Sequence, residues 1–195
     1  MGYSLDATDK DCYPDTTVLI NKLGITDEAV LKDNESFITS TIAAELICQP
    51  LKREFDFDDY KAIHYELFSE LYEWAGMVRT INLSKTTTVF AAPEQIEKLG
   101  TMIFDRLKKM NYFNGLSKSE YVMEIADLYS TLNMLHPFRE GNGRAQRIFF
   151  MQLIQNNGYN IDYSELNSNF LMISSIQAAS GVMDNLISFF DDNIH

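Results

Sequence analysis

Basic residues are scarce in this chain. It has 16 lysines and arginines against 28 aspartates and glutamates, for a net charge of -12 at pH 7. Proteins that bind nucleic acids use clusters of lysine and arginine to displace the counterions of the phosphate backbone, and the sequence has no such cluster. The composition therefore argues against a nucleic-acid partner. An anionic small ligand would have to be held by a few local arginines.

Cysteine is also rare. Cys12 and Cys48 are far apart and lack the spacing of metal ligands, which predicts two reduced thiols in a reducing compartment and no zinc site. The N-terminus has neither a basic nor an apolar signal region, and no segment approaches the roughly 20 apolar residues of a membrane span. We expect a cytoplasmic protein that has no membrane partner. Secretion by a signal of another kind stays an open alternative.

The sequence also lacks internal repeats, low-complexity tracts and linkers rich in proline, glycine or serine. Their absence predicts that residues 1–195 form one domain. Apolar residues make up 46% of the chain and recur at helical spacing. They predict an all-α bundle. The predicted helices cover residues 26–48, 56–76, 93–110, 117–136 and 144–157, with two more in about the last 35 residues.

Capping residues mark several of the predicted helix starts. Thr26 is the expected N-cap of the first helix, and Asp56 or Asp58 that of the second. Pro93 fits a first helical position, and Ser117 forms a capping box with a glutamate three residues later. Residues 79–92 are instead rich in threonine and β-branched side chains and predict a small strand pair, with 84–85 as the turn.

The polar run from His136 to Arg147 lies at the junction between two apolar helices. A histidine whose pKa is near neutrality can remove a proton from an attacking hydroxyl, so His136 is the candidate general base. A lone histidine at a helix end more often only hydrogen-bonds the last carbonyls, but its neighbours here favour catalysis. Glu140 is a candidate Mg²⁺ ligand, because one carboxylate with water and phosphate oxygens commonly holds that ion. It could instead be an ordinary carboxylate at a helix N-terminus.

The rest of the run suits an anion. Gly141, Asn142 and Gly143 allow a sharp turn and a close approach of the backbone to a ligand, and the N–H groups that follow form an anion site. Arg144 and Arg147 share one helix face near the N-terminus, where the helix dipole disfavours cations unless an anion is bound. Arginine binds phosphate oxygens through paired hydrogen bonds. The run therefore predicts a triphosphate site.

This run resembles the Fic signature, His-x-Phe-x-(Asp/Glu)-Gly-Asn-Gly-Arg-x-x-Arg, at all eight specified positions. The resemblance extends to residues 21–25, 63–64, 67–68 and 74–76, to Arg79, to the region of Phe90, and to residues 158–159. It implies a Fic-type helical bundle with a small β-hairpin flap, whose active core covers about 56–160. It also implies transfer of AMP from ATP to a Ser, Thr or Tyr hydroxyl of a target protein.

The resemblance assigns roles to the residues of the run. His136 would be the general base, Phe138 would anchor the loop in the core, and Glu140 would bind Mg²⁺. The anion hole around the α- and β-phosphates would be shaped by Gly141, Asn142 and Gly143. Arg144 and Arg147 would hold the remaining phosphates and orient the α-phosphate for in-line attack.

The threonine-rich segment would be the flap, which docks an extended target segment by β-augmentation. Its expected residues are Lys85, Thr86, Thr87, Thr88, Val89 and Phe90. A merely structural hairpin, with Phe90 simply packed, is the alternative. His64 lies in an apolar stripe, and we interpret it as a packing residue and not as a ligand.

Many Fic proteins are inhibited by a helix with the pattern Ser/Thr-x-x-x-Glu-Gly/Asn. Residues 41–45 have the threonine and the glutamate but continue with Leu46, and residues 175–181 lack the glutamate. We therefore expect any inhibition to come from a separate antitoxin-like chain that contacts Arg147, as in a toxin-antitoxin pair. Two alternatives stay open: another donor, for UMP, GMP or phosphoryl transfer, and a nucleotide-binding interaction protein without turnover.

Overall fold

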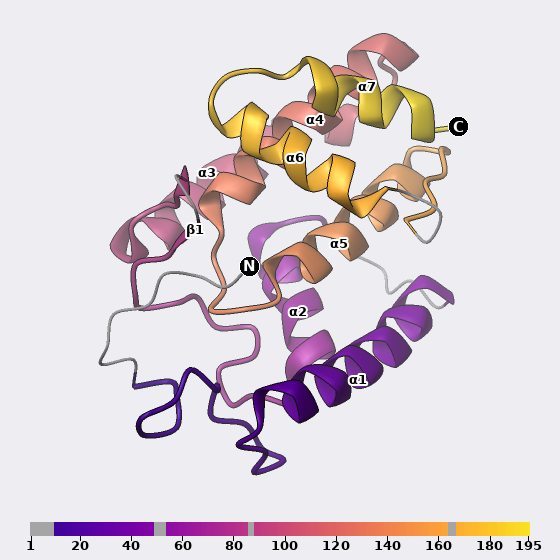
Figure 1. The fold of residues 1–195 in the computed structure, drawn as a ribbon. Helices are drawn as coiled ribbons and strands as arrows, with labels where there is room; N and C mark the ends of the chain where they lie inside the picture. Colours follow the sequence, from indigo (N-terminus) through magenta and orange to yellow (C-terminus); the bar gives the residue numbers. More distant parts are fainter. Residues whose placement is uncertain (1–9, 49–53, 86–87, 164–166) are drawn as a thin grey trace.

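The computed structural model describes residues 10–48, 54–85, 88–163 and 167–195, and these form the predicted helical bundle (Figure 1). The helices are α1 (Glu28–Cys48), α2 (Phe57–Phe68), α3 (Ile96–Lys109), α4 (Lys118–Leu135), α5 (Asn142–Asn156), α6 (Ser168–Ala179) and α7 (Asp184–Asn193). Two 3-10 turns, η1 (Pro93–Gln95) and η2 (Asn111–Phe113), flank α3. Within the described residues, no helix is both long enough and apolar enough to cross a membrane.

Helix α5 is the centre of the bundle. It packs against α1 and α2 on one side and against α4 on the other, while α6 and α7 pack together beside α4 (Figure 1). Phe149 of α5 is fully buried and meets the rings of Tyr60 and Phe104 edge-on, at centroid distances of 5.4 Å. Ten of its residues are buried, so α5 is held on several sides and its N-terminus is a rigid platform for the loop before it.

The helix starts agree with the capping signals at α2 and α4 and differ at two others. Pro93, predicted as a first helical position, opens the 3-10 turn η1, and the α-helix α3 begins at Ile96. Asp56 caps α2 through the N–H of Asp59, and the Ser117 capping box of α4 is present in full. At α1 the cap is Asp27, whose carboxylate accepts from the N–H of Val30 at 2.9 Å, so the prediction of Thr26 was wrong by one residue. Aspartate is as good an N-cap as threonine, and local pattern alone does not choose between neighbours.

The second predicted helix was too long. Helix α2 ends at Phe68, not at residue 76, although Leu71 and Tyr72 stay buried. Turns follow Phe68, and at their end Gly76, at φ 76°, donates its N–H to Nδ1 of His64 at 2.9 Å. The buried apolar residues of these turns have the same spacing as those of a helix, so the sequence pattern predicted a helix beyond Phe68.

The strand pair exists, but its turn is elsewhere. Strand β1 (Ser84–Lys85) pairs antiparallel with β2 (Thr88–Val89), with Ser84 opposite Val89 and Lys85 opposite Thr88. Residues 84–85, predicted as the turn, are therefore a strand. Two of the predicted flap residues, Thr86 and Thr87, lie outside the described residues.

Candidate active site

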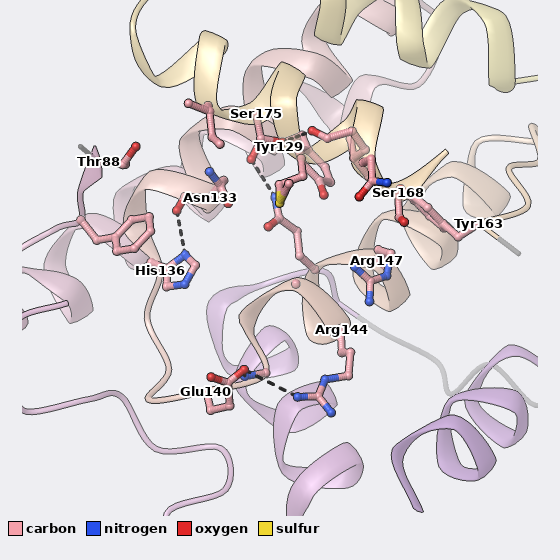
Figure 2. Close-up of a pocket in the computed structure, with 18 residues that line it drawn as sticks. Thr88, Tyr129, Asn133, His136, Glu140, Arg144, Arg147, Tyr163, Ser168 and Ser175 are labelled. Atoms are coloured by element: carbon pink, nitrogen blue, oxygen red, sulfur yellow. Dashed lines mark hydrogen bonds and ion pairs between the residues drawn. The ribbon is translucent and has the colours of Figure 1, made fainter. Parts of the chain in front are cut away.

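A cavity of about 550 Å³ opens where α4 ends, α5 begins and α6 crosses above them (Figure 2). Its wall includes His136, Glu140, Arg144 and Arg147 of the polar run, together with Gly141 and Gly143. The structure thus gathers around one cavity the predicted base, the predicted metal ligand and both predicted phosphate-binding arginines. Asn142 and Phe138 lie behind the wall.

His136 ends α4 in the left-handed conformation, at φ 43° and ψ 60°. Its Nδ1 lies 3.1 Å from the carbonyl oxygen of Asn133. A carbonyl can only accept, so Nδ1 carries the proton and Nε2 is the basic nitrogen. The ring of Phe90 stacks on the imidazole at 3.8 Å and 10°, which restricts its rotation. The arrangement suits a general base held in one tautomer.

A buried arginine ties this histidine to the flap. Arg79 is 4% exposed, and its Nε donates to the carbonyl of His136 at 2.8 Å. Its terminal nitrogens donate to the carbonyls of Ile81 and Ala91, on the two chain segments that flank the strand pair. Its backbone N–H donates to the carbonyl of Pro137. The guanidinium of Arg79 therefore fixes the two segments that flank the strand pair relative to His136.

The loop of residues 136–141 is anchored from below by an aromatic stack. Phe138 is fully buried and its ring lies 3.9 Å from that of His64, at 17°. Nε2 of His64 donates to the carbonyl of Glu140 at 2.9 Å, while Nδ1 accepts from Gly76. Burial lowers the pKa of His64 to about 4, and nearby Arg144 acts in the same direction, so the ring is neutral. His64 is thus a packing residue, as the sequence indicates, and it also holds the loop.

Asn142 closes the loop from inside. Its side-chain oxygen accepts from the N–H of Phe138 at 2.9 Å, and its side-chain nitrogen donates to the carbonyl of Phe138 at 2.7 Å. Both ends of the amide are used within the chain, so Asn142 shapes the loop and does not face the cavity.

Gly141 is required by the backbone. Its φ is 78°, and a Cβ there would lie 2.2 Å from the ring of Phe68. The N–H groups of Asn142 and Gly143 open α5 beside the cavity without a hydrogen-bond partner among the residues the structure describes. Unpaired N–H groups at a helix N-terminus form a site for an anion.

The two arginines have different surroundings. Arg144 pairs with Glu35 of α1, with NH2 2.5 Å from Oε1, and lies 3.6 Å from a carboxylate oxygen of Glu140. Within the described ranges, Arg147 makes no ion pair. Arg147 lines the cavity near Tyr129. Burial raises the pKa of Tyr129 to about 12, so this phenol stays neutral. Arg147 therefore presents a cation to the cavity.

The flap residues divide between two surfaces. Thr88 and Phe90 line the cavity, and Val89 is 72% exposed on the outer side. Lys85 belongs to β1. Alternate residues of a strand point to opposite faces, which explains the division.

Sequence reasoning missed several residues of this site. Glu35 is 109 positions from Arg144, and Arg79 was noted without a role. The upper wall of the cavity comes from α6, with Ser168, Ser175 and Met172 among its residues (Figure 2). A lone glutamate or serine on an amphipathic helix carries no local signal of such a contact.

Residues 54–154 match the model of the Fic/DOC family. The chain belongs to the Fic/DOC family. It is 35% identical over 181 residues to protein adenylyltransferase VbhT of Bartonella schoenbuchensis, covering 93% of this chain and 38% of VbhT. It is 33% identical over 171 residues to the probable protein adenylyltransferase y4lH of Sinorhizobium fredii, covering 87% and 88% of the two chains.

Solved structures of Fic domains agree with this assignment. The BepC protein of Bartonella tribocorum, with bound AMPPNP, superposes with a TM-score of 0.87 at 29% identity, covering 95% of this chain and 96% of that one. An N-terminal Fic domain from Bartonella quintana with bound ADP superposes at 0.88 and 29% identity, covering 95% and 94%. The Fic-type helical fold predicted from the signature is confirmed.

Proposed function

We propose that this Fic protein is a nucleotidyltransferase that moves AMP from ATP to a Ser, Thr or Tyr hydroxyl of a target protein. The observation that carries the proposal is that a histidine with a basic Nε2 and a helix N-terminus suited to phosphates open into one cavity. VbhT is named a protein adenylyltransferase, and two related Fic domains hold AMPPNP and ADP. Residues 1–195 would form a single domain, with the active core at about 56–160.

The chemistry follows from the placement of His136. The hydroxyl oxygen of the target attacks the α-phosphorus while Nε2 takes the hydroxyl proton. A new oxygen–phosphorus bond forms, and the bond from the α-phosphorus to the bridging oxygen of the β-phosphate breaks. Pyrophosphate leaves, and the proton remains on His136 until solvent removes it. The stack on Phe90 and the hydrogen bond to Asn133 keep Nε2 aimed at the hydroxyl.

Phosphate binding falls to the start of α5. The N–H groups of Asn142 and Gly143, with Gly141 shaping the turn, would bind the α- and β-phosphates, since such groups carry a partial positive charge. Arg147 would bind the terminal phosphate with paired hydrogen bonds. Arg144 would contribute from the other side of the cavity, where its side chain is 27% exposed.

Glu140 would hold Mg²⁺. Its side chain is 32% exposed on the cavity wall, and it is the single carboxylate among the described lining residues. One carboxylate combined with phosphate oxygens and water is the usual donor set for this ion in nucleotide sites, so the residues present fit it. The bound ion would neutralise charge on the phosphate oxygens.

The flap would dock the target. Lys85, Thr86, Thr87, Thr88, Val89 and Phe90 would offer a strand edge to an extended target segment, with main-chain hydrogen bonds giving affinity. Phe90 stacks on His136, so it would also position the acceptor side chain.

Regulation would come from a second protein. The segment 41–45 is an ordinary part of α1, and Glu45 is exposed and away from the cavity lining. An antitoxin-like chain would instead place a carboxylate on Arg147. Cys12 and Cys48 form no disulfide within the described residues, and this fits the cytoplasm as the proposed compartment. If Glu45→Gly activated the isolated protein, the inhibitor would be internal and this part of the proposal would be wrong.

The donor and the transferred group are tested together. The purified protein and His136→Ala are incubated with a protein extract, Mg²⁺ and ATP, UTP or GTP in turn, and modified peptides are identified by mass spectrometry. We expect an AMP adduct on a Ser, Thr or Tyr with the unsubstituted protein alone. A UMP, GMP or phosphate adduct would replace the proposed reaction by another transfer, and nucleotide binding without any adduct would exclude catalysis.

A further inference from the structure

Glu35 lies on α1, outside the residues that match the Fic family, and yet its carboxylate reaches the active site. Its Oε1 is 2.5 Å from NH2 of Arg144, and its side chain is 13% exposed. This is a largely buried ion pair between the first long helix and the phosphate-binding loop. A buried pair persists only when hydrogen bonds satisfy its remaining atoms.

Those hydrogen bonds are present. The hydroxyl of Tyr72 donates to Oε2 of Glu35, and NH1 of Arg144 donates to the hydroxyl of Thr39 at 3.3 Å. The ring of Phe68 lies 4.7 Å beneath the guanidinium. Burial raises the pKa of Tyr72 well above its usual range, and Glu35 adds to the shift, so this hydroxyl remains a donor. Arg144 is therefore fixed from several directions.

The same NH2 nitrogen faces a second carboxylate. It lies 3.6 Å from Oε1 of Glu140, four residues earlier in the chain. Glu140 lies in the loop before α5, and opposite charges at this distance attract each other. Glu35 is the nearer of the two carboxylates, and both lie within ion-pair distance of the guanidinium. Without Glu35, the ion pair between Arg144 and Glu140 would tighten.

We propose that Glu35 is a positioning residue that holds Arg144 off Glu140 and so keeps the Glu140 carboxylate available to a divalent cation bound with the nucleotide. The inference rests on the proposed function, because it concerns the metal ligand of that site. Helix α1 would then influence metal affinity, although it lies outside the run from His136 to Arg147.

The test measures nucleotide affinity against Mg²⁺ concentration by isothermal titration calorimetry. The ligand is α,β-methylene-ATP, in which the bond that would break is replaced. For Glu35→Gln we expect the Mg²⁺ concentration for half-maximal affinity to rise about tenfold, which corresponds to about 1.4 kcal/mol. Without Mg²⁺ the variant should bind at least as tightly as the unsubstituted protein, because one negative charge near the phosphates is gone.

Two further variants sharpen the result. Asp33→Asn removes the same charge from an exposed position of α1 and should leave the Mg²⁺ dependence unchanged. Tyr72→Phe removes only the donor to Glu35 and should shift the dependence in the same direction, by less. Melting temperatures of all variants establish that they are folded.

Three outcomes decide the matter. A selective rise in the Mg²⁺ requirement of Glu35→Gln supports the inference. An unchanged requirement, or an equal loss of affinity with and without Mg²⁺, overturns it and leaves the proposed function intact. If the unsubstituted protein binds no nucleotide, the proposed function fails and this inference fails with it.

Discussion

His64 is held neutral in the interior, and this determines how the stability of the protein should change with pH. The ring is fully buried between Phe138 and Phe68, and its two nitrogens are occupied by Glu140 and Gly76. Its pKa falls from 6.5 to about 4. The unfolded chain therefore binds a proton on His64 between these values while the folded chain does not, so acid favours unfolding.

The size of the effect follows from the two pKa values. The contribution of His64 to the free energy of unfolding is complete above about pH 7 and falls by about 1.4 kcal/mol per pH unit below 6.5, levelling near pH 4. Between about pH 7.5 and about pH 4.5 the loss amounts to about 2.5 kcal/mol. That is a large share of the roughly 5–15 kcal/mol that stabilises a typical domain.

The assay is urea unfolding across this pH range for the unsubstituted protein and for His64→Gln. The glutamine amide can still donate to the carbonyl of Glu140 and accept from Gly76, but it does not titrate. Subtracting the two free energies of unfolding at each pH isolates the contribution of His64, because the contributions of the other titrating groups are the same in both proteins and cancel. Parallel curves from about pH 7.5 to about pH 4.5 would refute the neutral, buried histidine.

Three further predictions concern the loop and the start of α5. Phe138→Ala should lower the free energy of unfolding by ~3 to 5 kcal/mol, measured by urea denaturation, because a fully buried ring is removed; a loss under about 1 kcal/mol would mean that this ring does not anchor the loop. Gly141→Ala should destabilise by more than about 2 kcal/mol, since the methyl group meets Phe68 at a positive φ. Gly143→Ala should leave stability equal or slightly higher, because its Cβ meets only Arg147 at 3.4 Å, yet raise the KM for ATP by crowding the phosphates. An unchanged KM would place the phosphates away from the start of α5.

Local signals predicted much of this fold. The spacing of apolar residues located the helices, and the capping box at Ser117 and the cap at Asp56 marked their starts, because these interactions join residues three or four apart. The run from His136 to Arg147 is likewise contiguous in the sequence, so its residues necessarily lie together at one helix junction. The structure places Gly141, Gly143, both arginines and Glu140 on the wall of one cavity.

Contacts between distant segments could not be predicted in this way. Glu35 meets Arg144 only because α1 packs on α5, and Arg79 reaches His136 across 57 positions. The end of α2 was missed because the turns after Phe68 keep Leu71 and Tyr72 buried, and apolar spacing does not distinguish such turns from a helix. Each of these contacts depends on tertiary packing, which a single sequence does not display.

The most direct test compares His136→Ala with the unsubstituted protein for ATP binding and for transfer of α-labelled phosphate to a protein acceptor. Our account predicts that the variant binds ATP nearly as well, because the start of α5 and Arg147 are intact, while the transfer rate falls at least about 100-fold. Transfer at the original rate by His136→Ala would contradict the account, and so would label appearing from the γ-phosphate instead of the α-phosphate.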